Sequence, residues 1–127
     1  MQILLFLALA AAPPIAAPPP GWTLLIGDEN ARTHYDPASI RSAGGDLMRL
    51  HIVSNLAEPS NAAVRFDVEL VVSCRARTTA LLAASMYDAA GTLLGSRETD
   101  LAEAVFEPIA SPSVEERAHA IVCRDRG

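Results

Sequence analysis

Apolar and polar residues alternate along the middle of the chain, as they do in half-buried β-strands. The clearest alternating run is VRFDVELVVSC (residues 64–74), whose apolar positions fall on one side: Phe66, Val68, Leu70, Val72 and Cys74. A second run, from Leu47 to Val53, follows a Gly-Gly-Asp turn at residues 44–46. Both runs predict antiparallel strands, and the first directs Cys74 into the core.

Shorter apolar runs predict further strands. GWTLLIGD (21–28) and ARTHYDPASI (31–40) each contain a short run that ends at a turn signal. TTALLAASMYDAAGTLLGS predicts a hairpin, with a strand at residues 78–87, a turn at 88–91 and a returning strand. Because alanine disfavours strands, a helix at residues 79–84 is the alternative for this segment.

The last segment has the period of a helix. Ser113 suits the N-cap position, and Glu116 stands three residues later, where a capping box places an acidic residue. The apolar residues of the following ten-residue stretch share one stripe: Val114, Ala118, Ile121 and Val122. A one-faced antiparallel sheet would cover that stripe. We therefore predict an α+β fold, a single antiparallel sheet of about six strands with a C-terminal helix packed on one face.

The N-terminal residues 1–17 are predicted to be a secretory signal peptide. Their apolar run, residues 3–12, is too short to span a bilayer and leads into small residues and prolines. A buried N-terminal strand is the alternative. Residues 18–127 then form one domain, because a chain of 127 residues with 50% apolar residues fits a single core. We expect export to the periplasm or the exterior, without a membrane span and without a lipid anchor on an N-terminal cysteine.

Cys74 and Cys123 are the only cysteines. Export to an oxidising compartment favours a disulfide between them over free thiols or a metal site. Zinc would need two further ligands, and the three histidines have no recognisable metal spacing. A bridge closing a loop of about fifty residues would stabilise the fold by about 4 kcal/mol. It would also secure a helix that is too short to be stable alone.

The formal net charge of −5 argues against nucleic acid as a partner, because phosphate binding needs a basic face. One basic cluster stands out nonetheless, since arginines follow both cysteines in CRAR and CRDR. A bridge would bring four of them into one neighbourhood: Arg75, Arg77, Arg124 and Arg126. Such a patch would bind the phosphate or carboxylate groups of lipopolysaccharide, glycans or a partner protein. Scattered solubilising charge is the alternative, because Arg75 alternates with Cys74 and Asp125 partly neutralises the tail.

The sequence contains no motif for catalysis. GSRE (95–98) lacks the nucleophile-elbow pattern, and GTLLG (91–95) is a hairpin turn rather than a phosphate loop. The acidic residues at 98, 100, 103 and 107 have no spacing that would fix a metal or form an acid–base pair. We therefore predict a non-enzymatic protein without cofactor or metal.

Several short features occur in an order that is similar to a known family. They are Trp22, Tyr35-Asp36, Ser39-Ile40, a strand ending in Cys74, a hairpin at 87–91, FEPIASPSVEE (106–116) and a terminal IVC. In these features the chain resembles the surface-adhesin protein E family of Gram-negative bacteria. The resemblance implies a sheet of about six strands, a helix tethered by a disulfide, and a role in binding host or envelope macromolecules. The alternative is a small periplasmic enzyme or ligand carrier with a pocket between sheet and helix. The sequence leaves the oligomeric state open.

Overall fold

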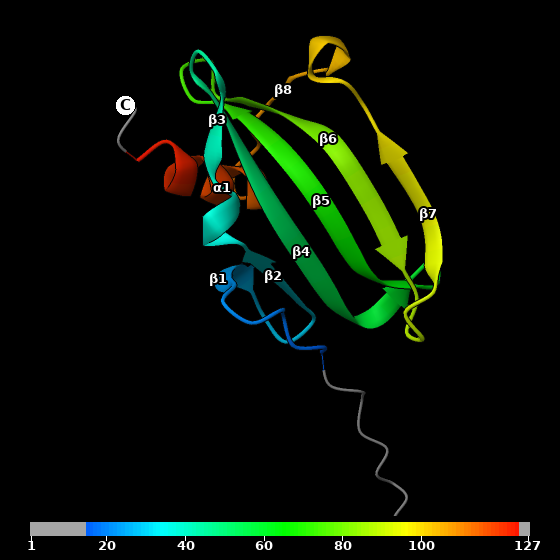
Figure 1. The fold of residues 1–127 in the computed structure, drawn as a ribbon. Coiled ribbons are helices and arrows are strands. Elements are labelled where there is room, and N and C mark those ends of the chain that lie inside the picture. The colour runs from blue at the N-terminus through cyan, green and yellow to red at the C-terminus, as the bar shows by residue number, and fades with distance from the viewer. Residues whose placement is uncertain (1–14, 125–127) are drawn as a thin grey trace, which may run out of the picture.

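The computed structural model describes residues 15–124, so most of the predicted signal peptide lies outside the described residues. It consists of one antiparallel sheet with a helix, α1 (Val114–Val122), on one face (Figure 1). The strands are β1 (Thr23–Gly27), β2 (Ala31–Tyr35), β3 (Arg41–Gly44), β4 (Leu47–Ser60), β5 (Ala63–Ser73), β6 (Thr78–Tyr87), β7 (Leu93–Glu98) and β8 (Glu107–Pro108). No helix within residues 15–124 is long and apolar enough to cross a membrane.

The predicted fold class is confirmed, although the sheet has eight strands instead of about six. Six of them follow one path in the order β1-β2-β4-β5-β6-β7, while β3 pairs with β4 and β8 pairs with β6. The two additional strands have four and two residues, which is too short to show an alternating pattern.

The main core lies between the helix and the middle strands. In the register of β4 and β5, Met48 faces Val72, Leu50 faces Leu70, and Ile52 faces Val68. These residues form a single cluster with the buried helix residues Ala118 and Val122 and the two cysteines. The alternation predicted for residues 64–74 therefore describes the helix-side face of β5.

The predicted hairpin is confirmed in β6 and β7. Thr79 pairs with Val72 and Leu81 pairs with Leu70, so residues 79–84 are a strand and the helical alternative is wrong. Pairing with a long central strand outweighs the low strand propensity of alanine. The connecting turn is closed by the carboxylate of Asp88, which accepts the N–H groups of Ala90 and Thr92, both at 2.9 Å.

The helix begins at the predicted cap. The Ser113 Oγ accepts the N–H of Glu116 at 3.0 Å. The Glu116 carboxylate accepts the hydroxyl of Ser111 at 2.8 Å, which replaces the reciprocal half of a capping box. The predicted apolar stripe faces the sheet, where Val114 and Ile121 pack around the buried Ala118 and Val122.

The opposite face of the sheet has a small core of its own, which the expectation of a one-faced sheet missed. Val71, Ala80 and Leu82 are buried there beneath residues 99–110, a segment that we call the strap. The strap contains η3 (Leu101–Glu103) and β8, and it contributes Leu101, Ala104 and Phe106 to this core. The expectation failed because an isolated apolar residue on an otherwise polar strand face does not reveal what covers it.

Candidate binding site

The predicted disulfide joins Cys74 to Cys123, with the two Cα atoms 5.6 Å apart. Cys74 directly follows the last residue of β5, and Cys123 is the C-cap of α1, where its N–H donates to the carbonyl of His119 at 2.9 Å. Both cysteines are buried in the main core. The bond therefore fixes the end of the helix to the end of a central strand.

Asp46, in the turn between β3 and β4, organises the same end of the molecule. Its carboxylate accepts the backbone N–H of Arg75 at 2.8 Å and the hydroxyl of Ser73 at 3.1 Å. These donors favour the charged form, so the pKa of Asp46 lies below its ordinary value, chiefly because of the Arg75 N–H. Asp46 thereby couples two turns that are almost thirty residues apart in sequence.

His119 also holds the helix to this end. Its Nε2 lies 3.1 Å from the carbonyl oxygen of Cys74, and the side chain is half-buried. This contact forms because the disulfide brings the last turn of α1 over the backbone of the turn that follows β5.

The structure describes three of the four arginines of the predicted patch, and all three are exposed. Arg75 and Arg77 lie in the turn between β5 and β6, and Arg124 directly follows the C-cap of α1. The turns after β3 and β5 and the end of α1 meet at one end of the molecule (Figure 1). Among residues 15–124, none of the three forms an ion pair. Arg126 lies outside the described residues.

One argument against the patch does not hold in the structure. Strand alternation would send Arg75 to the opposite face from Cys74, but β5 ends at Ser73, so alternation no longer applies. Asp46, the nearby carboxylate, already accepts a backbone N–H and a hydroxyl. We call the three exposed arginines Arg75, Arg77 and Arg124 the basic end.

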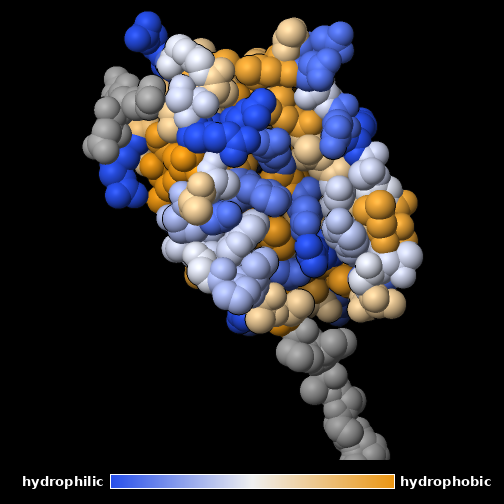
Figure 2. Space-filling model, in the orientation of Figure 1, coloured by the Kyte–Doolittle hydropathy of each residue, from blue (hydrophilic) through white to orange (hydrophobic). Residues whose placement is uncertain are grey.

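The face opposite the helix is strongly polar, and three of its arginines, Arg41, Arg49 and Arg65, are already paired. Figure 2, which looks at this face, shows a hydrophilic band across the middle strands. Arg41 and Arg49 both approach Glu69, at 3.5 and 3.7 Å, and Arg65 makes a bidentate pair with Asp67 at 2.8 Å. No group of His, Cys, Asp or Glu side chains in residues 15–124 could hold a metal ion. These partly exposed ion pairs account for the polar band as a solvated surface.

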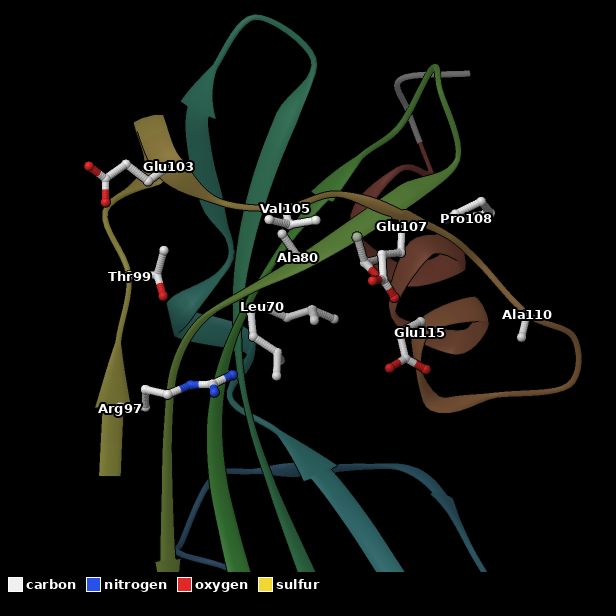
Figure 3. A pocket seen from close by; sticks show the side chains of 12 residues that line it. Leu70, Ala80, Arg97, Thr99, Glu103, Val105, Glu107, Pro108, Ala110 and Glu115 are labelled. Atoms are coloured by element: carbon white, nitrogen blue, oxygen red, sulfur yellow. The ribbon is translucent and has the colours of Figure 1, made fainter. Parts of the chain in front are cut away.

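A hollow of the described structure lies on the helix side of the sheet. It is a groove of about 620 Å³ between β6, the strap and the first turn of α1 (Figure 3). Leu81 and Val105 contribute its apolar lining, and the charged side chains at its margins are Arg97, Glu103, Glu107 and Glu115. The sequence analysis noted two of these glutamates, Glu103 and Glu107, only as acidic residues without the spacing of a metal site or an acid–base pair. It missed the groove because Arg97 and Glu115 enter it from separate elements.

The chain is a small α+β domain, a single antiparallel sheet with a disulfide-tethered helix and exposed charged surfaces. The family model of surface-adhesin protein E matches residues 22–124, and the chain belongs to that family. It therefore has a surface-adhesin-like binding role, in a family of exported surface proteins that bind host or envelope partners.

Two solved structures show the same fold. A crystal structure of Haemophilus influenzae protein E is 17% identical, with a TM-score of 0.58, over 88% of this chain and 93% of that one. Its crystal form II is 16% identical, with a TM-score of 0.58, over 91% of this chain and 94% of the other. No curated protein sequence matches this chain. At this identity the likeness concerns the fold alone, so the residues that bind must be argued from the structure of this chain.

Proposed function

We propose that this chain is an exported, non-enzymatic module that binds anionic surface polymers, lipopolysaccharide or acidic glycans, through the basic end. The observation that carries the proposal is the set of three exposed guanidinium groups without ion-pair partners among residues 15–124. Guanidinium groups bind phosphate and carboxylate in a planar, bidentate geometry. The basic end is therefore suited to anions even though the whole chain carries a net charge of −5.

The backbone that carries these arginines is well supported. The disulfide fixes Cys74 and Cys123, which directly precede Arg75 and Arg124, and Asp46 holds the backbone of Arg75. A preformed arrangement lowers the entropy lost on binding. The ligand therefore meets guanidinium groups on a fixed backbone, and only the side chains need to become ordered.

Export is the second part of the proposal. The apolar run at residues 3–12 supports a signal peptide at residues 1–17, and residues 18–127 would then be the mature domain. The disulfide supports an oxidising compartment, the periplasm or the exterior. Membership of an adhesin family supports a binding role without catalysis.

Retention on heparin and on lipopolysaccharide beads tests the proposal. We expect Arg75→Ser/Arg77→Ser to elute at lower salt than the unaltered chain, and the variant that also carries Arg124→Ser and Arg126→Ser to elute lower still. The matched control is Arg32→Ser/Arg117→Ser, which removes two exposed arginines from other parts of the surface. If control and test variants elute together, general charge rather than the basic end governs retention. Unchanged retention of the fourfold variant would refute the proposal.

A further inference from the structure

We propose that the groove between β6, the strap and α1 is a docking site for a basic segment of a partner protein that also carries apolar side chains. This binding surface is separate from the basic end and selects the opposite charge. Two features of the groove define the partner: its apolar lining and an excess of carboxylates.

The apolar lining is exposed in the isolated chain. The side chain of Leu81 on β6 is 45% exposed, and that of Val105 on the strap is 74% exposed. Covering apolar side chains is favourable by about 25 cal/mol per Å² of surface removed from water. A partner with apolar side chains at alternate positions would cover both residues.

The edge of β6 at the groove has a short gap in its pairing. On this edge β6 pairs with β7 at Ala83, opposite Glu98, and with β8 at Thr79, opposite Glu107, and the carbonyl of Leu82 accepts the N–H of Thr99. Ala80 and Leu81 lie between these points, and because successive residues direct their backbone groups to opposite edges of a strand, only one of the two can bond a partner on this edge. The apolar lining and the charge of the groove therefore define the partner more than backbone pairing does.

The charge of the groove defines the partner's side chains. The groove has three carboxylates, Glu103, Glu107 and Glu115, and one cation, Arg97. Two of the carboxylates, Glu107 and Glu115, lie on the side opposite Arg97 (Figure 3). None of the four forms an ion pair among the described residues. Unpaired carboxylates around an apolar surface complement lysine or arginine side chains and repel acidic ones. A second copy of this chain, at a net charge of −5, is a poor match.

Peptide titrations followed by NMR test this docking site. The probe is a soluble, capped hexapeptide that alternates Lys and Val, and the comparison peptide alternates Glu and Val. We expect the basic peptide to shift the amide signals of Ala80, Leu81 and Val105, and the acidic peptide to leave them in place. Glu107→Gln/Glu115→Gln should weaken binding roughly three- to tenfold, the range expected for two exposed ion pairs. The matched control, Glu29→Gln/Glu58→Gln, removes two exposed carboxylates elsewhere and should bind as the unaltered chain does.

Further outcomes separate the alternatives. Equal shifts with the acidic peptide, or equal loss in control and groove variants, would overturn the docking site. Shifts at the groove on raising the protein concentration without peptide would assign it to a second copy and also overturn it. Heparin retention of Glu107→Gln/Glu115→Gln reports on the basic end alone and should not fall.

Discussion

The two faces of the sheet are covered in different ways. On one face α1 covers a large core, and it is the last described element of the chain, so only its N-terminal end is continuous with the sheet. On the other face the strap covers only Val71, Ala80 and Leu82, but β6 holds it at both ends. The N–H of Thr99 donates to Leu82 at 2.9 Å, and that of Ile109 donates to Arg77 at 3.2 Å. Backbone hydrogen bonds attach the strap at both ends, whereas the disulfide attaches α1 at its C-terminal end.

The surroundings of the disulfide end of α1 and of the strap differ in charge. The disulfide end of α1 lies beside exposed arginines without partners among the described residues, and the strap contributes two glutamates to the groove. The polar band on the face opposite the helix carries both signs, but its charges pair with one another. Charges left without partners by the fold are those available to a ligand.

Removing the disulfide should produce the largest effect. Cys74→Ser/Cys123→Ser opens a loop with a sequence separation of 49 residues, and we expect a loss of about 4 kcal/mol in the free energy of unfolding. Urea unfolding followed by circular dichroism measures this loss. Because α1 has only nine residues, hydrogen exchange should show its amides losing protection before those of β5. If the strap loses protection together with the helix, the two covers are not independent.

A substitution in the strap core should lower the stability by less than loss of the disulfide does, and its effect should stay local. Phe106 is half-buried in the small core, and Phe106→Ala should cost about 1–2 kcal/mol, less than the 3–5 typical of a fully buried phenylalanine. Hydrogen exchange should show faster exchange at the Ile109 N–H, which pairs with Arg77, and unchanged protection in α1.

Leu50→Ala is the matched change in the main core. Leu50 is fully buried beneath the helix, so its loss should cost about 2–5 kcal/mol and affect the whole sheet. Equal costs for Leu50→Ala and Phe106→Ala would show that the strap is as important to stability as the helix.

The sequence predicted those parts of the fold that depend on local patterns. Alternation over residues 64–74 predicted that Cys74 faces the core, and the Ser113 cap predicted where α1 begins. The family resemblance implied the same sheet and the same disulfide-tethered helix. The strap core was not predictable in this way. Val71 is one apolar residue on a polar face, and its cover lies about thirty residues further along the chain. A contact of this kind has no periodicity to reveal it.

Of the two candidate sites, one was predicted from the sequence and the other was not. The basic end was predicted because its arginines directly follow the two cysteines, so the disulfide alone brings them to one place. The groove was not predicted because β6, β7, the strap and α1 each supply only a few of its residues. The gap between the ends of β7 and β8, where Ala80 and Leu81 have no partner on that edge, depends on where the strap leaves the sheet.

The smallest expected effect concerns Asp46, which supports the disulfide end without a covalent bond. Its pKa is lower in the folded chain than the value of about 3.9 in an unfolded one, so the folded state favours the carboxylate. The stabilisation is therefore present above about pH 4 and is lost as the pH falls through the folded pKa. Asp46→Asn should lower the melting temperature slightly at pH 7, and the difference from the unaltered chain should shrink at pH 3. Glu58→Gln, an exposed change away from this turn, should show no comparable difference. A gap of equal size at both pH values would mean that Asp46 acts through side-chain shape rather than charge, so the turn would not depend on the ionised carboxylate.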